Sequence, residues 1–337
     1  MIRDTARRLL RRPHWAGREV ALPFDMFDEA RSAAEAATAR KLEGVYHKGQ
    51  KKAWNGRELL PDLVARHGGV ELPPDQRRAV QALFAVILWG ELAAWRVSAD
   101  LALHLEPLEA KMAATSQAHD EARHFYVMHD YLAHLGEVPK SLPPATTRVL
   151  VGTLRADTLT KKLVGMQMMI EPMALALFQM VRESRIEPVL CDLIAYYERD
   201  EARHVALGVL HLPKLLQGMS ALEAADLWQW EFREYSAQWR MLRELQPHFK
   251  ALGLDPRRVI DIARNKQLRA NQMLVQELGA PVPVLEAFVR FFEAKAEWEF
   301  PRETYATRRD HLAAVWQAAT HSGMQQEVPV ALTDVPV

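Results

Sequence analysis

The pentapeptide Asp-Glu-Ala-Arg-His occurs twice in this chain, at residues 120–124 and 200–204. Each copy has an isolated glutamate thirty positions before its own glutamate, and every member of the second set lies eighty residues after its counterpart. The chain therefore carries a duplicated set of four carboxylates and two imidazoles at constant spacing. Its members are Glu91, Glu121, His124, Glu171, Glu201 and His204.

The spacing within each set predicts a helical hairpin. The glutamate and histidine of a pentapeptide are three residues apart, so they share one face of a helix. An α-helix rises about 1.5 Å per residue, so position 121 returns to the level of position 91 only if the chain reverses near the midpoint. Glu106-Pro107 lies there, and Glu187-Pro188 directly follows Ile186, the midpoint of the second set. Proline favours the first helical position and disfavours helix in its predecessor. We therefore predict two αα-hairpins with all six side chains at one height.

The chemistry of this set points to a pair of redox metals. Oxygen and nitrogen ligands suit iron or manganese. Glu91 and Glu171 lie in apolar runs, where an isolated acid needs a partner, so an exposed helix face is a poor explanation of the motif. Four carboxylates in a bundle core cannot all stay ionised unaided. Two divalent cations would cancel the charge; without metal, protons must do so, which predicts raised carboxylate pKa values.

This constellation resembles the ferritin-like di-iron carboxylate superfamily. Within it, the chain resembles the branch that holds ribonucleotide reductase small subunits, their ligand-binding oxidase relatives, bacterial multicomponent monooxygenase hydroxylases and acyl-carrier-protein desaturases. The resemblance spans roughly residues 50–215. It implies an all-α fold, a ferritin-like four-helix bundle with a crossover, extended by additional N- and C-terminal helices.

The resemblance also implies residues that support the ligands. The acid before each motif glutamate would orient the histidine of the opposite motif, so Asp200 would hold His124 and Asp120 would hold His204. Arg123 and Arg203, directly before the histidines, complete these supporting positions.

The marks of the known subfamilies are mostly absent. Met128 stands where radical-generating reductase subunits carry a tyrosine, and Leu175 stands where multicomponent hydroxylases carry a threonine. Ala93 and Met166 occupy the places that ligand-binding oxidases cross-link. The subfamily stays unresolved, and radical initiation for nucleotide reduction is disfavoured.

Helical spacing from the ligands also predicts a largely apolar pocket or relay. Its members would be Tyr197, Gln117, Trp95, Phe125, Met128, Met168, Leu175 and Phe178. Gln117 and Tyr197, each one turn before a motif glutamate, are expected to hydrogen-bond a ligand carboxylate, and Tyr197 is alternatively an electron relay. Pro172, directly after Glu171, should kink its helix or open a bulge.

Together these features predict an O₂-activating dinuclear iron oxidase or oxygenase, of monooxygenase or oxidase type, acting on an apolar lipid-like or aromatic substrate. The expected cofactors are two Fe ions, with Mn/Fe as a variant, and O₂ is the co-substrate. No dinucleotide fingerprint is present, so electrons must come from an external donor or reductase. Two alternatives remain open: an iron-handling or peroxide-reducing protein like ferritins and rubrerythrins, and a non-catalytic helical scaffold.

Composition limits the setting. The 337 residues include 43 basic and 43 acidic side chains, which gives no electrostatic case for nucleic-acid binding. The single cysteine, Cys191, fits a reducing cytoplasm. No run of eighteen apolar residues occurs, so a membrane span is not expected. The resemblance suggests a homodimer.

The expected organisation has four parts. A basic N-terminal arm, helix and lead-in loop would occupy residues 1–74, and the di-iron bundle core residues 75–215. C-terminal helices packed on the core would occupy residues 216–322, and an extended or disordered tail residues 323–337. Outside the ligand helices, amphipathic periodicity predicts a loop from His47 to Asn55 and helices near 25–45, 145–156, 219–246, 256–278, 282–297 and 302–320.

Overall fold

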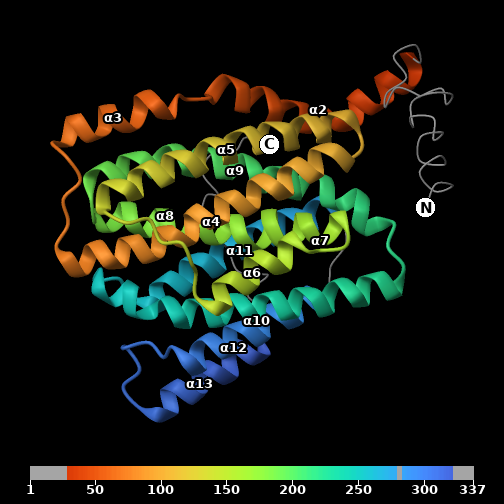
Figure 1. The fold of residues 1–337 in the computed structure, drawn as a ribbon. Coiled ribbons are helices and arrows are strands. Elements are labelled where there is room, and N and C mark those ends of the chain that lie inside the picture. The colour runs from red at the N-terminus through yellow and green to blue at the C-terminus, as the bar shows by residue number, and fades with distance from the viewer. Residues whose placement is uncertain (1–28, 279–282, 322–337) are drawn as a thin grey trace, which may run out of the picture. The chain divides into compact units, whose positions relative to one another are not determined.

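The computed structural model of the chain describes residues 29–278 and 283–321, and all regular structure within these two ranges is helical (Figure 1). The all-α prediction is therefore confirmed. The chain divides into two compact units, residues 1–40 and 41–337. Of the first unit, only the start of helix α2 (Glu29–Lys52) is described, and everything below concerns the second. The predicted basic arm and the predicted tail at 323–337 lie outside the described residues.

Two helical hairpins carry the repeated motifs. Helices α4 (Pro74–His104) and α5 (Leu108–Leu135) form the first, and α8 (Glu171–Ser184) and α9 (Pro188–Gln217) form the second. The reversals fall at the two Glu-Pro dipeptides, as predicted. At the second reversal Glu187 caps α9, because its carboxylate accepts hydrogen bonds from the backbone nitrogens of Val189 and Leu190. Helix α5 packs against α9, so the two hairpins meet along their motif-bearing helices.

The crossover between the hairpins ends in a π-helical segment. Helices α6 (Pro144–Leu154) and α7 (Leu159–Leu163) occupy the crossover, and α7 runs directly into η1 (Val164–Ile170). The backbone nitrogen of Glu171 donates to the carbonyl of Met166, five residues back. Pro172 has no N–H to continue an α-helical ladder. The predicted distortion is thus confirmed, and it lies in the turns before the proline.

The remaining helices surround the bundle. Helix α3 (Gly56–His67) contacts α5 and α9, α10 (Ala221–Ala251) contacts α4 and α6, and α11 (Pro256–Leu278) contacts α8 and α9. Helices α12 (Pro283–Glu299) and α13 (Arg308–Thr320) form a further pair (Figure 1).

The expected loop from His47 to Asn55 is mostly wrong, because α2 continues to Lys52. Gly49 has a packing role within this helix. A Cβ atom there would lie 2.1 Å from the Ser116 hydroxyl oxygen, so glycine allows α2 to approach α5 closely. The last helix also begins later than predicted, at Arg308, where Thr307 and Asp310 form a capping box.

Two helical stretches, Pro74–His104 and Leu159–Ser184, are long and apolar enough to cross a membrane by length and composition. More than half of each stretch's most apolar window is buried inside the molecule, at 56% and 72%. The core helices of a folded bundle meet the same criterion, so this is weak evidence for a membrane span.

The ligand candidates divide the bundle core into two apolar clusters. On α4, Leu88 before Glu91 belongs to one cluster and Ala94 after it belongs to the other. On α9, Tyr197 and Val205 flank Glu201 in the same way. A layer of charged side chains therefore lies between two hydrophobic layers.

Candidate metal centre

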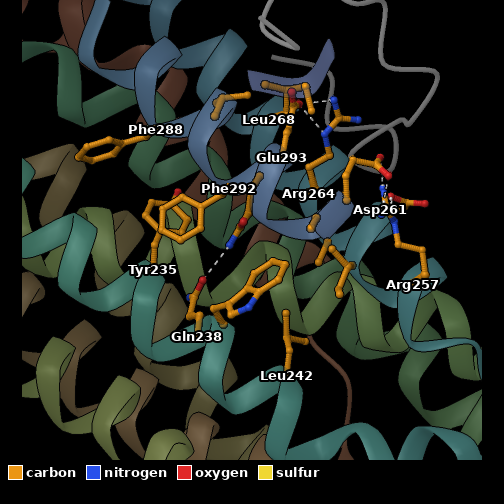
Figure 2. Close-up of a pocket in the computed structure, with 18 of the residues that line it drawn as sticks. Tyr235, Gln238, Leu242, Arg257, Asp261, Arg264, Leu268, Phe288, Phe292 and Glu293 are labelled. Atoms are coloured by element: carbon orange, nitrogen blue, oxygen red, sulfur yellow. Dashed lines mark hydrogen bonds and ion pairs between the residues drawn. The ribbon is translucent and has the colours of Figure 1, made fainter. Parts of the chain in front are cut away.

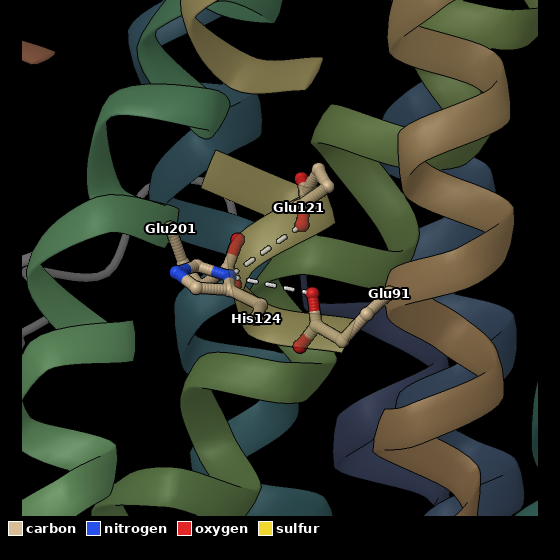
Figure 3. A group of neighbouring side chains, drawn as sticks. All are labelled: Glu91, Glu121, His124 and Glu201. Carbon is tan, nitrogen blue, oxygen red and sulfur yellow. Dashed lines mark ion pairs between the residues drawn. The ribbon is translucent and has the colours of Figure 1, made fainter. Parts of the chain in front are cut away.

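The six ligand candidates meet inside the bundle. Each is at most 5% exposed. They form two overlapping groups in which the possible ligand atoms all lie within 4.8 Å of one another. The first group, drawn in Figure 3, contains Glu91, Glu121, His124 and Glu201. The second contains Glu121, Glu171, Glu201 and His204. Each group therefore has one histidine and three carboxylates, and the glutamates of the two pentapeptides belong to both.

His124 presents one ring nitrogen to the carboxylates and the other to the opposite motif. Its Nδ1 lies 3.4 Å from Glu91 Oε2 and 3.1 Å from Glu201 Oε1. Its Nε2 lies 3.2 Å from Asp200 Oδ2. The Nδ1 atom is therefore the one placed to bind a metal, while Asp200 can fix the ring orientation, as the sequence predicts.

His204 repeats this arrangement. Its Nδ1 lies 2.7 Å from Glu201 Oε2 and 3.0 Å from Glu121 Oε1. Its Nε2 lies 3.5 Å from Asp120 Oδ2. Asp120 thus faces His204 as Asp200 faces His124, but His204 Nε2 makes no hydrogen bond, whereas His124 Nε2 is within hydrogen-bond distance of Asp200.

A buried ionic network supports the histidines from outside. Arg123 donates to Asp120 at 2.5 Å and to Asp200 at 2.9 Å, and Arg203 donates to both aspartates at 2.8 Å. The indole of Trp54 donates to Asp200 at 2.7 Å, and the Arg123 guanidinium lies 4.6 Å from the centre of its ring. Burial alone would raise the pKa of Asp200, but its contact with His124 and the charge of Arg203 lower it. The aspartates are therefore anionic partners for the imidazoles.

An amide chain links two of the ligand carboxylates. The side-chain nitrogen of Gln117 donates to Glu121 at 3.1 Å and to Glu171 at 3.0 Å. Gln167, in the π-helical segment, donates to the Gln117 oxygen at 3.0 Å. The predicted hydrogen bond from Gln117 to a ligand carboxylate is confirmed. Gln167 lies one turn before Glu171, as Gln117 lies one turn before Glu121.

Tyr197 does not contact a ligand carboxylate, which corrects the expectation for this residue. Its hydroxyl donates to the backbone carbonyl of His124 at 2.7 Å, and its ring stacks on the imidazole with centroids 4.1 Å apart. Tyr197 thus positions His124 by packing and by a backbone hydrogen bond.

The carboxylates of the cluster separate into two kinds. Burial, and next the charge of Glu201, raises the pKa of both Glu91 and Glu171. Burial opposes ionisation of Glu121 as well, but the charge of His204 and contacts with both imidazoles lower its pKa. The pKa of Glu201 is also lowered, against burial and the charge of Glu121, by His204 and by a contact with His124.

Both imidazole pKa values are raised. Burial opposes this for His124, but contacts with Asp200 and the surrounding glutamates dominate, and Glu121 and Glu201 act in the same way on His204. Protons therefore neutralise part of the cluster, as predicted. The expectation that all four carboxylates have raised pKa values is wrong for Glu121 and Glu201, because the histidines carry the compensating charge.

Unsatisfied atoms indicate that the cluster fits cations. Among the described residues, Glu121 Oε2, Glu201 Oε1 and His124 Nδ1 are buried and make no hydrogen bond. They nevertheless converge, since His124 Nδ1 lies 3.6 Å from the first and 3.1 Å from the second. Buried polar atoms without hydrogen bonds are uncommon in native proteins. A pair of metal ions bound by oxygen and nitrogen would satisfy all three.

A cavity of about 80 Å³ lies beside Glu91 and Glu171, and we call it the inner cavity. Its walls come from α4, α6, α8, α10 and α11 and include Met173, Leu242 and Val259. Spacing along the ligand helices could not identify the residues of α10 and α11, which are distant in sequence.

The inner cavity differs from the pocket or relay predicted from spacing. None of the eight residues predicted from spacing lines the inner cavity: Gln117, Tyr197, Trp95, Phe125, Met128, Met168, Leu175 and Phe178. Trp95 is 40% exposed, and Phe178 is buried in the core against the ring of Tyr197.

A buried cluster with one glutamate on each of two helices and a Glu-x-x-His pair on each of two others defines the ferritin-like dinuclear carboxylate proteins. None of the family models or curated proteins compared matches the chain. Among solved structures, 29 chains match.

Three of these similar structures are R2-like ligand-binding oxidases. One is a mutant with an anaerobically reconstituted Mn/Fe cofactor, with 17% identity and a TM-score of 0.44, covering 82% of this chain and 92% of its own. Another is a mutant with an aerobically reconstituted Mn/Fe cofactor, with 16% identity, a TM-score of 0.42 and coverages of 84% and 93%. A third, with an aerobically reconstituted metal cofactor after photoconversion, has 17% identity, a TM-score of 0.42 and coverages of 71% and 90%.

Proposed function

We propose that this chain is an O₂-activating dinuclear iron oxidase or oxygenase with an apolar organic substrate. The proposed metal ligands are Glu91, Glu121, His124, Glu171, Glu201 and His204. The observation that carries the proposal is the overlap of two buried ligand groups, which share Glu121 and Glu201. Shared carboxylates hold two cations close together, which is the arrangement that a two-metal site requires.

Each part of the site has a distinct task in this proposal. When bound, the metal pair would supply the electrons and the Lewis acidity for reducing O₂. Glu121 and Glu201 would contribute to both ligand groups, and Asp200 and Asp120 would orient the imidazole rings. Gln117 would restrain Glu171 by the hydrogen bond already described. The mostly apolar inner cavity would present an organic group to the Glu91 and Glu171 side of the site.

The test is anaerobic loading of the full chain with Fe(II), followed by O₂. We expect about two irons per chain, uptake of O₂, and near-ultraviolet charge-transfer absorption of the oxidised pair. Glu121→Ala should reduce the iron content to less than about one iron per chain and remove the absorption, since Glu121 contributes to both ligand groups. Glu137→Ala is the matched control, because its side chain is 82% exposed and remote from the cluster.

Other outcomes would decide against this function. Many irons per chain would indicate iron storage, and consumption of hydrogen peroxide in preference to O₂ would indicate a peroxide-reducing protein. No bound metal after iron and manganese supplementation would indicate a non-catalytic scaffold. Mn/Fe loading would change the cofactor within the same proposal, since geometry and metal availability decide which first-row ions bind.

The proposal needs an external electron donor or reductase for each turnover. A homodimer and a cytoplasmic location stay predictions of the sequence. Size-exclusion chromatography with light scattering would test the first, and localisation of a tagged chain the second.

A further inference from the structure

A larger cavity lies outside the four ligand-bearing helices, between α10, α11, α12 and α13 (Figure 2). We call it the outer cavity. Its volume is about 340 Å³, within the usual range for small-molecule sites. It shares the wall residues Met173, Gln238, Leu242 and Ala263 with the inner cavity. The two cavities are therefore neighbours, and only the inner one is lined by Glu91 and Glu171.

The body of the outer cavity is apolar and aromatic. Tyr235, Trp239, Phe288 and Phe292 line it, and the rings of Tyr235 and Phe292 lie 5.4 Å apart (Figure 2). Aromatic walls favour flat apolar ligands, which stack on them or meet their edges.

The charged groups of the outer cavity are already paired. Arg257 forms an ion pair with Glu297 at 2.5 Å, and Arg302 pairs with Asp261 at 2.8 Å. Arg264 donates to Glu293 at 2.8 Å. Three guanidinium groups and three carboxylates thus neutralise one another, so the wall offers no excess charge to an anion or a cation. An ionic ligand would lose its hydration without a compensating partner.

One polar group is placed between the two cavities. The Gln267 amide nitrogen donates to Gln238 Oε1 at 3.2 Å and to the carbonyl of Met169 at 3.0 Å. Met169 belongs to the π-helical segment that leads to Glu171. Gln238 is buried and lines both cavities, so its amide nitrogen is placed to donate to a ligand.

We propose that the outer cavity binds a neutral, flat and largely apolar molecule with one hydrogen-bond acceptor, and that this molecule is the substrate class of the metal centre. The statement rests on the proposed function. The inner cavity, at about 80 Å³, holds only one end of such a molecule. That end passes between Met173 and Leu242, where the flexible thioether can move aside, while Gln238 holds the acceptor.

The test uses two fluorescent probes of the same ring system on the full chain. Phenylnaphthylamine is neutral, and anilinonaphthalenesulfonate carries one negative charge. We expect the neutral probe to bind at least about tenfold more tightly. Val289 lines the outer cavity, and Val289→Trp should fill part of it. The substitution should weaken binding of the neutral probe by at least about tenfold.

The connection to the metal centre is tested with Co(II)-loaded protein. The neutral probe should perturb the visible cobalt spectrum of the wild type. Ala263→Leu, at the junction of the two cavities, should keep probe binding and lose that perturbation. Ala313→Leu, at an exposed position of α13, is the matched control and should behave as wild type.

Each result decides something. Equal or tighter binding of the anionic probe, or no effect of Val289→Trp, would overturn the ligand class. An unperturbed cobalt spectrum in the wild type at saturating probe would overturn the connection. If cobalt and iron fail to bind at all, the proposed function fails, while the probe titrations still test the outer cavity by themselves.

Discussion

Asp200 joins more of the supporting network than any single ligand does, since it contacts Trp54, Arg123, Arg203 and His124. We expect Asp200→Asn to weaken metal binding by roughly 10- to 100-fold, because the neutral amide holds the imidazole less firmly and leaves two buried arginines under-compensated. Anaerobic Fe(II) titration against a chelator measures this. Asp192→Asn, on the half-exposed side of the same helix, is the control. Unchanged affinity in Asp200→Asn would contradict the orienting role.

His211 provides a separate prediction about acid stability. Burial, and next the charge of Lys214, lowers the pKa of His211 to about 4. In the unfolded chain the value is about 6.5. Below that pH the unfolded state takes up a proton that the folded state does not, so stability is lost as the pH falls.

We expect His211→Gln to reduce the loss of unfolding free energy between pH 7 and pH 5 by about 2 kcal/mol. Urea unfolding at the two pH values measures the difference. The exposed His129→Gln variant should show the wild-type loss. An equal loss in His211→Gln would mean that His211 is protonated in the folded protein.

For individual residues, the sequence predicts the site members that belong to the repeated motif. Four of the six ligand candidates and the four charged supports belong to the two identical pentapeptides, and Glu91 and Glu171 follow from their equal distance to the motif glutamates. Trp54 lies 146 residues from its partner Asp200, and no spacing connects them. The hydroxyl of Tyr197 donates to the backbone carbonyl of His124 and not to a ligand carboxylate, and residue types alone do not determine this partner.

At the level of elements, the π-helical segment depends on a glycine of the neighbouring helix. A Cβ atom on Gly208 would lie 2.6 Å from Gln167 Cβ. We expect Gly208→Ala to lower the unfolding free energy by about 1–3 kcal/mol, because η1 must move away from α9. Chemical denaturation measures it.

Gly44→Ala is the matched comparison, since nothing lies within 4 Å of the added methyl group. It should raise the unfolding free energy by about 0.5–1 kcal/mol, the usual gain for alanine in a helix. Equal stabilisation by both substitutions would show that η1 and α9 are not closely packed.

The elements themselves were largely predictable where local signals act. The Glu-Pro reversals and the distortion near Pro172 follow from proline chemistry. The inner and outer cavities were not predictable, because residues such as Leu242 and Phe292 reach them from helices whose placement depends on tertiary packing. Gly49 lies within the predicted loop at 47–55, but in the structure it allows the close contact between α2 and α5.

For the whole molecule, metal removal and pH are coupled. The raised pKa values of Glu91, Glu171 and both histidines mean that the metal-free cluster holds protons which bound cations would displace. We expect metal affinity to rise with pH, by about tenfold per pH unit for each proton released. The lowered pKa values of Glu121 and Glu201 add nothing near neutrality, since these groups are already ionised there.

The same pKa shifts determine how the stability of the metal-free protein depends on pH. Groups with raised folded-state pKa values stabilise the metal-free protein at low pH, and this contribution is lost as the pH rises through those values. The difference between the melting temperatures of metal-loaded and chelator-treated protein should therefore increase as the pH rises. A constant gap would contradict proton displacement at the cluster.

Each half of the repeat completes the site of the other, since Asp120 lies against His204 and Asp200 against His124. A separate hairpin would hold only three ligand candidates, two glutamates and one histidine, and that histidine would lack the aspartate that faces it in the complete bundle. Ion capture must therefore wait until residues some eighty positions apart have been synthesised and docked. In a growing polypeptide, the full ligand set therefore cannot assemble before His204 has been synthesised.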